Sequence, residues 1–180
     1  TGYRNPGGDL PWLDSPEAKR SWRVANDAQL AVVLMTLPPG PSPDLLTRVA
    51  ALASEFPGTR IVLDHAAWPA YEGAPGYGLT PEHVALVRFP NVFFKLTSIL
   101  FTEQADANLS SAAFVRHLAD TFGASRLMWG SDMGNTPGTY AALAALARES
   151  AKTLNPAETD DYLYRTGALT FAARGAKSGG

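Results

Sequence analysis

The chain has 180 residues, of which 46% are hydrophobic and 18% are charged, and its formal net charge is -2. This composition is that of one soluble globular domain and excludes a disordered or fibrous chain. The small net charge, with no run of lysine or arginine, excludes an electrostatic patch for nucleic acid, and the absence of cysteine leaves histidine and carboxylates as the metal ligands.

The chain begins with a glycine- and proline-rich segment, residues 1–12, for which we expect a loop. Beyond it, a capping side chain stands directly before a proline at four places. Each pair predicts a helix start, because the missing N–H of proline costs nothing at the first helical position. The four pairs are Ser15-Pro16, Ser42-Pro43, Thr80-Pro81 and Asn155-Pro156.

Four short apolar runs alternate with helical segments. Runs of this kind are typical of strands covered on both faces. The predicted strands are residues 31–37, 61–63, 92–94 and 127–129; the helices after them are 43–56, 81–89, 111–122 and about 139–153. Further helices are expected from about 16 to 30 and from 156 onward. This alternation predicts an α/β fold in which helices cover a parallel sheet.

Four such units fit either an open doubly wound sheet or half of an eight-unit barrel. Polar residues stand just past the four strand ends, at Thr36, Asp64-His65, Lys95 and Ser131-Asp132. In a barrel they would all converge on one rim, whereas in an open sheet only a switch point would gather them. The pattern therefore favours the barrel.

Four segments, in this order, resemble the carboxyl-terminal half of the amidohydrolase-related (amidohydrolase family 2) metal-dependent hydrolases. They read VLDHAAWP, FPNVFFKLT, FGASRLMWGSD and TLNPAETDDYLYRTGA. This group includes aminocarboxymuconate semialdehyde decarboxylase-like and lactonase-like proteins. The resemblance implies a partial (β/α)8 TIM barrel, about strands five to eight, over residues 1–180, with a flexible tail at 175–180. It also implies a divalent metal, with zinc as the first candidate.

By the same resemblance, Asp132 would bind the metal or hold the attacking water. His65 would act as an acid or base, or polarise a substrate carbonyl. Both roles suit these residue types, because imidazole titrates near neutrality and a carboxylate beside a metal stays ionised. Asp132 has a second interpretation, in which it caps the turn that follows it.

The ligand count bears on the metal. A catalytic zinc usually takes three protein side chains, and only His65 and Asp132 are placed for it in this sequence. The His-x-His pair of such families lies on the first strand, and no histidine ends the predicted strand at 31–37. The isolated chain is therefore expected to be inactive. His83 and His117 fall in helical segments and are expected to be packing or surface residues.

Lys95 would point into the barrel mouth, where it either binds a substrate carboxylate or pairs with a neighbouring acid. Trp68 either walls a pocket for a planar acid or belongs to the core. Asp64 is expected to bond loop amides after its strand. The long loop at 66–79 is a candidate lid.

The leading hypothesis is a metal-dependent hydrolase or decarboxylase that acts on a small carboxylic acid, ester or lactone and is complete only with an amino-terminal half. The alternatives are a non-catalytic barrel relative and a stand-alone α/β binding domain. Unpaired edge strands of half a barrel predict a homo-oligomer. No apolar run is long enough to span a bilayer and no signal peptide is evident, so a cytoplasmic location is expected.

Overall fold

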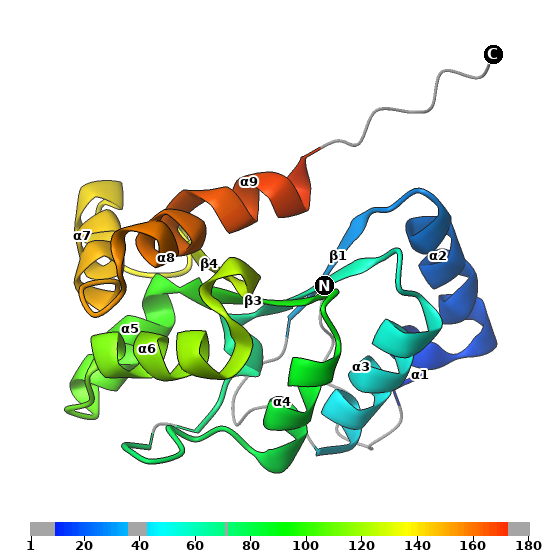
Figure 1. Cartoon of the computed structure of the whole chain (residues 1–180), viewed down its shortest axis with the longest axis horizontal. Coiled ribbons are helices and arrows are strands. Elements are labelled where there is room, and N and C mark those ends of the chain that lie inside the picture. The colour runs from blue at the N-terminus through cyan, green and yellow to red at the C-terminus, as the bar shows by residue number, and fades with distance from the viewer. Residues whose placement is uncertain (1–9, 36–42, 71, 173–180) are drawn as a thin grey trace.

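The computed structural model describes residues 10–35, 43–70 and 72–172, which form a four-stranded parallel sheet with its helices (Figure 1). The strands are β1 (Ala31–Leu34), β2 (Arg60–Asp64), β3 (Val92–Thr97) and β4 (Leu127–Gly130). The α-helices are α1 (Pro11–Asp14), α2 (Pro16–Asp27), α3 (Pro43–Glu55), α4 (Pro81–Ala85), α5 (Ser98–Asp106), α6 (Ser111–Phe122), α7 (Tyr140–Ser150), α8 (Pro156–Asp160) and α9 (Thr166–Phe171). A π-helical turn, Asp161–Arg165, joins α8 to α9, and short 3-10 turns are His65–Ala67, Leu86–Arg88 and Ala124–Arg126. Within these ranges no helix combines the length and apolar character needed to cross a bilayer.

The order of the strands decides between the two predicted folds. It runs β1-β2-β3-β4, and each strand is parallel to its neighbour. A doubly wound sheet reverses its order at a switch point, whereas a barrel adds each unit beside the previous one. The sequential order is therefore that of a barrel segment. In Figure 1, α2 and α3 lie on the β1 side of the molecule, and α5 to α8 lie on the β4 side.

The hydrophobic core lies on one face of the sheet. Every second strand residue packs there against the helices and is buried, because successive strand residues point to opposite faces. These core residues are Leu34, Ile61, Leu63, Val92, Phe94, Leu96 and Leu127. The residues between them, including Val62 and Met128, form a second face. The start of α9 packs on this second face, since a Cβ placed on Gly167 would lie 3.9 Å from the Cβ of Met128.

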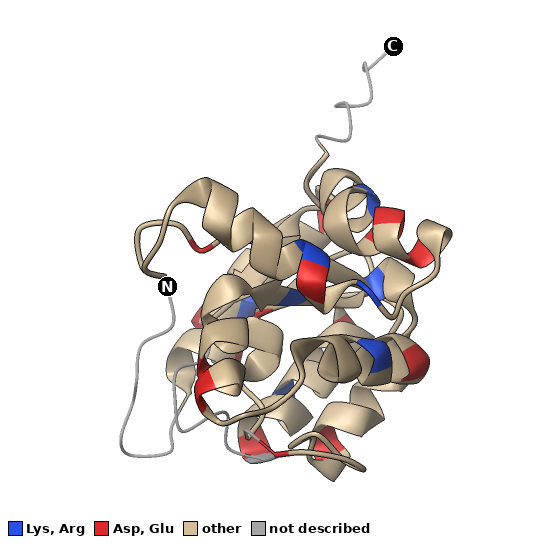
Figure 2. Ribbon diagram, turned by 90° about the vertical axis from the view of Figure 1, so that its left-hand side faces the viewer, with Lys and Arg blue, Asp and Glu red and all other residues tan. Residues whose placement is uncertain are grey.

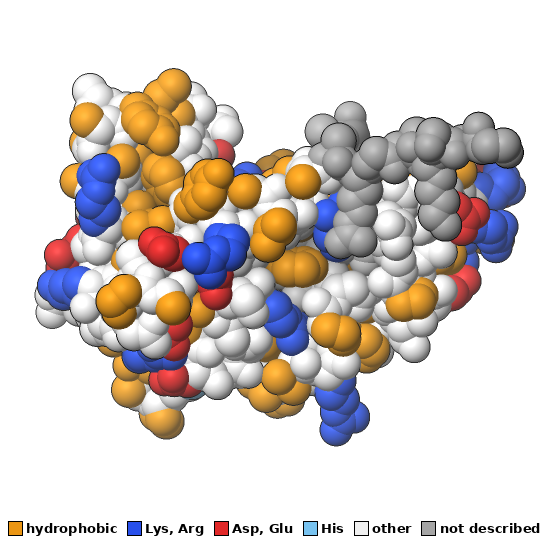
Figure 3. Space-filling view, turned by 45° about the horizontal axis from the view of Figure 1, so that its top comes forward, with side chains coloured by type: hydrophobic (Ala, Val, Ile, Leu, Met, Phe, Trp, Pro, Cys, Tyr) orange, Lys and Arg blue, Asp and Glu red, His pale blue; other side chains and the backbone are white. Residues whose placement is uncertain are grey.

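The prediction that every strand is covered on both faces is wrong for β1. Val33, on the second face, is 39% exposed, so the described residues leave this face of β1 partly uncovered. The same prediction is confirmed for β2, where Ile61, Val62 and Leu63 are fully buried. Figure 3 shows apolar side chains gathered over a hollowed part of the surface. Exposed large hydrophobic residues near the sheet's amino end include Leu30, Leu169 and Phe171.

Three of the four predicted helix starts are confirmed by their capping bonds. The side chains of Ser15, Thr80 and Asn155 each accept a backbone N–H three residues later. Ser42, Thr36, residues 1–9 of the expected loop and the tail at 175–180 lie outside the described residues. The loop prediction is wrong at Pro11-Trp12, which begin α1, because proline at a first helical position also starts a helix there.

Positions of basic and acidic residues are interspersed over the helices (Figure 2). Arg116 of α6 is 2.7 Å from the Glu158 carboxylate of α8 and makes a second bond to its other oxygen. Paired bonds of this geometry are stronger than single ones, so this pair fixes α8 against α6.

Candidate active site

Polar residues from three neighbouring strands meet at the carboxyl edge of the sheet. Asp64 ends β2 and is followed by His65, Lys95 and Thr97 lie at the end of β3, and Asp132 follows β4. The charges of Asp64, Asp132 and Lys95 all act on His65. The structure therefore brings the sequence-predicted residues into one electrostatic neighbourhood, as expected for parallel strands that end at a common edge.

His65 is buried, with 5% of its surface exposed. Its Nδ1 atom lies 2.6 Å from Oγ1 of Thr97, which is itself fully buried. Burial lowers the pKa of His65, and the carboxylates of Asp64 and Asp132 oppose this shift. The neutral imidazole is thus the stable form near pH 7, with one ring nitrogen committed to Thr97 and the other free to exchange a proton.

The backbone at His65 is strained. Residues His65, Ala66, Ala67 and Trp68 have φ angles of 53°, 50°, 61° and 52°, and none of them is glycine. Each such residue costs on the order of 1 kcal/mol or more, and the conformation persists only where the surrounding structure enforces it. Here Ala66 and Ala67 are fully buried, and the Trp68 N–H donates to the His65 carbonyl at 2.7 Å. Packing therefore holds the histidine in one orientation.

His83 of α4 supports this turn. Its Nδ1 accepts the backbone N–H of Thr80 at 3.2 Å, and the residue is 1% exposed. Burial lowers the pKa of His83 to about 4, although a hydrogen bond with the Ala67 backbone acts to raise it. His83 is therefore a neutral packing residue, and His117 of α6 packs its ring 4.9 Å from that of Tyr77. The packing roles expected for both histidines are confirmed.

Asp64 and Lys95 form an ion pair across β2 and β3. Their Oδ1 and Nζ atoms are 2.9 Å apart, and the side chains are 14% and 27% exposed. The two residues are partners in the strand register, so the sheet itself sets their proximity. Of the two roles predicted for Lys95, pairing with an acid is visible in the structure. This ion pair, not a bond to loop amides, is the interaction that the structure shows for Asp64.

The carboxylate of Asp132 is oriented by its own loop. Its Oδ1 accepts a hydrogen bond from Asn135 Nδ2 at 3.1 Å, and its Oδ2 accepts one from Thr136 Oγ1 at 3.2 Å. The Asp132 carbonyl also accepts the backbone N–H groups of both residues. Asp132 does cap the turn that follows it, and this turn fixes the carboxylate, half-buried, within electrostatic range of His65.

The described residues do not by themselves fit a catalytic zinc. Among them, no three histidine, aspartate or glutamate side chains stand close enough together to hold a metal ion. A zinc enzyme takes three such protein ligands and keeps one position open. His65 and Asp132 alone leave this set incomplete.

Trp68 packs in the core beside His65, the second of its two predicted roles. It is 6% exposed and belongs to the core cluster, yet its ring lies 4.5 Å from that of His65. Its indole N–H is buried without a hydrogen-bond partner among the described residues. In the loop that follows, Tyr77 packs on His117, and the described residues of the candidate lid that are exposed are 70 and 72–76.

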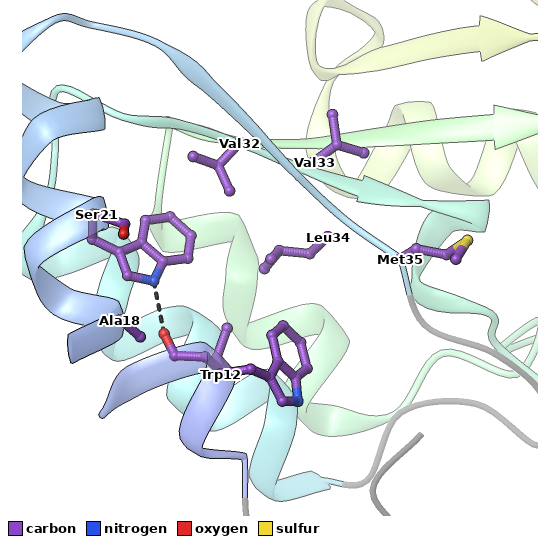
Figure 4. Close-up of a pocket in the computed structure, with 9 residues that line it drawn as sticks. Trp12, Ala18, Ser21, Val32, Val33, Leu34 and Met35 are labelled. Carbon is purple, nitrogen blue, oxygen red and sulfur yellow. Dashed lines mark hydrogen bonds between the residues drawn. The ribbon is translucent and has the colours of Figure 1, made fainter. Parts of the chain in front are cut away.

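A cavity of about 320 Å³ lies elsewhere, between α1, α2 and β1 (Figure 4). Its walls are apolar apart from Ser21, and the Trp22 indole N–H beside it donates to the Leu13 carbonyl at 2.7 Å. None of the candidate site residues lines it, and it offers no convergent charged groups. It is therefore not a candidate for the chemistry of this chain.

Sequence reasoning missed Thr97. The strand was predicted to end at Phe94, but β3 continues to Thr97, so that Lys95 and Thr97 are alternate residues of one strand. Extending the period-two pattern past the apolar run would have placed both on the same face. Thr97 is the one hydroxyl that bonds His65 in the described part of the chain.

A sequential parallel sheet with acid–base groups at its carboxyl edge defines a segment of a (β/α)8 barrel enzyme scaffold. The sequence model of the family described as Amidohydrolase matches residues 3–168, and the chain belongs to this family. The family predicted from the four sequence segments is confirmed.

Individual relatives agree with this assignment. The chain is 36% identical, over 128 residues, to an L-fucono-1,5-lactonase of Burkholderia ambifaria, covering 69% of this chain and 41% of that protein. An amidohydrolase from Burkholderia multivorans, crystallised with bound Zn, superposes with a TM-score of 0.66 at 25% identity, over 91% of this chain and 60% of that one. A 2,6-dihydroxybenzoate decarboxylase from Rhizobium has a TM-score of 0.60 at 14% identity, over 93% and 59%. The chain thus spans less than two thirds of each of these relatives.

Proposed function

We propose that the protein containing this chain hydrolyses a small lactone or ester of a carboxylic acid. The observation that carries this proposal is the convergence of His65, Asp132 and Lys95 at the carboxyl edge of three adjacent strands. The 36% identity to a lactonase supports a lactone as the substrate class. Decarboxylation of a small acid is the second candidate, favoured by the fold shared with the 2,6-dihydroxybenzoate decarboxylase.

Each residue has a proposed role. His65, neutral and held by Thr97, acts as the general acid or base, or polarises the substrate carbonyl. Asp132, fixed by its loop, orients the attacking water. Lys95 binds the substrate carboxylate or carbonyl oxygen, and Trp68 forms the wall beside the histidine. These are the groups that acyl transfer requires: a proton carrier, a water-holding carboxylate and a cation for developing negative charge.

We propose that the whole protein binds a divalent metal and that zinc is the first candidate. The amidohydrolase from Burkholderia multivorans with bound Zn supports this proposal. Asp132 is the ligand proposed from this chain. The remaining ligands, and the strands that would close the barrel, are proposed to come from the length that the relatives have beyond this chain. The alternatives of a non-catalytic relative or a stand-alone binding domain predict no turnover by a barrel completed in this way.

The test uses the full-length gene product and a sugar-acid 1,5-lactone, with acid release measured by a pH indicator. We expect turnover by the wild type and a loss of about 100-fold in Asp132→Asn, because an amide neither accepts a proton nor stays charged. Asp106→Asn, an exposed change at the end of α5, is the matched control. Hydrolysis by Asp132→Asn within twofold of the wild type would rule out the proposed role. Evolution of CO2 from an acid substrate without lactone hydrolysis would favour the decarboxylase.

A further inference from the structure

The side chain of Lys95 runs across Gly130 of the neighbouring strand. The register pairs Lys95 with Asp64 on one side and Met128 on the other, and Gly130 follows Met128 by two residues on the same face. A Cβ atom built on Gly130 would lie 2.5 Å from Cε of Lys95 and 3.4 Å from both its Cγ and Cδ. The lysine thus occupies the space that any other residue at position 130 would fill.

Space, not backbone conformation, requires glycine here. The φ angle of Gly130 lies outside the left-handed region, unlike those of Gly123 and Gly134. An alanine could therefore adopt this backbone, because only positive φ angles penalise a Cβ. What excludes the alanine methyl group is the lysine tail, which is held at its tip by the Asp64 carboxylate at 2.9 Å.

We infer that Gly130 is a positioning residue: together with Asp64, it holds the Lys95 ammonium at the carboxyl edge of the sheet. Asp64 fixes the end of the side chain, and the missing side chain at 130 provides the channel along which it lies. An ammonium group has three donors, and its contact with Asp64 is an ion pair at 2.9 Å, so the held group can present donors to a substrate oxygen. The benefit to substrate binding rests on the function proposed above, but the positioning itself does not.

A double-mutant cycle on the full-length gene product tests the positioning. Gly130→Ala is expected to lower the folding equilibrium constant by up to about fivefold, the effect of displacing the lysine tail from its ion pair with Asp64. The same change in a Lys95→Ala background is expected to cost nothing, since the obstructing atoms are gone. Gly167→Ala, on the helix that faces Met128 of the same strand, meets only ordinary contact at 3.9 Å and serves as the matched control. Equal losses in the two backgrounds would overturn the inference.

A second measurement does not depend on stability. The measurement is NMR on protein labelled with ¹³C at lysine Cε. The chain contains four lysines, and the signal that disappears in Lys95→Ala is that of Lys95. We expect two resolved Hε shifts for the wild-type Lys95 and a single averaged shift in both Gly130→Ala and Asp64→Asn. An unchanged pair of shifts in Gly130→Ala would refute the positioning role.

The proposed function is tested separately by kinetics of the full-length gene product. If Lys95 binds the substrate carboxylate, Gly130→Ala raises KM for a lactone carrying a carboxylate about tenfold while kcat changes less than twofold; if Lys95 stabilises the charge that develops on the carbonyl oxygen, kcat falls instead. A single averaged Hε shift in Gly130→Ala, combined with an unchanged KM, would support Gly130 as the positioning residue and exclude Lys95 from substrate binding.

Discussion

Replacing His65 with glutamine is expected to lower kcat of the full-length gene product by about 10²- to 10⁴-fold, the usual contribution of a general acid or base. Glutamine keeps a similar size but cannot exchange a proton near neutral pH. Burial lowers the pKa of His65, so the acidic limb of the wild-type kcat/KM profile is expected below pH 6.5. A variant that keeps a third or more of the wild-type kcat, while folded by circular dichroism, would exclude His65 as the proton carrier.

Variants of Thr97 test the same role of His65, with a smaller expected loss of activity. Thr97→Val keeps the shape of the side chain but removes the hydroxyl 2.6 Å from Nδ1 of His65, and we expect a loss of about tenfold in kcat. Thr97→Ser retains the hydroxyl and is the matched control, with activity close to the wild type. If the two variants lose activity equally, packing at Thr97 and not its bond to the histidine is what matters.

His83 is expected to make the fold sensitive to acid. Its pKa is about 4 in the folded chain, against an ordinary value of 6.5, so the unfolded chain binds the proton more readily. The stability contributed by the neutral side chain is therefore complete above pH 6.5 and is lost as the pH falls from 6.5 towards 4. At about 1.4 kcal/mol per pKa unit, the loss amounts to about 3 kcal/mol. The physical reason is that the buried site desolvates the charged imidazolium, which the unfolded chain leaves in water.

The measurement is the free energy of unfolding in urea at several pH values between 7 and 4. His83→Gln is expected to flatten the dependence on pH by about this amount relative to the wild type. His65, whose pKa is also lowered, adds a slope of the same sign to both proteins, so the difference between them isolates His83. Identical slopes for His83→Gln and the wild type would contradict the assignment.

Much of the fold was predictable because its signals are local. Ser15, Thr80 and Asn155 cap helices through bonds to residues only three positions away, which a sequence pattern can contain. The four strands coincide with apolar runs, because the core demands such residues. The end of β3 was missed, since polar Lys95 and Thr97 interrupt the run and the strand continues there only through pairing with β2 and β4.

The candidate site also has some features that the sequence predicted and others that it did not. The positions of His65 and Asp132 after their strands were visible in the sequence, and so was the family they belong to. The left-handed turn from His65 to Trp68 was not, because no glycine marks it and the conformation is enforced by burial of Ala66 and Ala67. The bond from His65 to Thr97 joins residues 32 positions apart and has no local signature.

By itself, then, the sequence determined most of the helices and strands, though not α1, α5 or the end of β3, as well as their alternation and the residue types that stand at the strand ends. Only the tertiary structure decided that the strands lie in sequential order and that Lys95 crosses Gly130 on its way to Asp64. The physical reason is the distance along the chain over which each kind of interaction acts. Capping and apolar patterns act over a few residues, whereas strand register is set by which side chains the core must bury, and a shift of one residue would turn Lys95 to the opposite face.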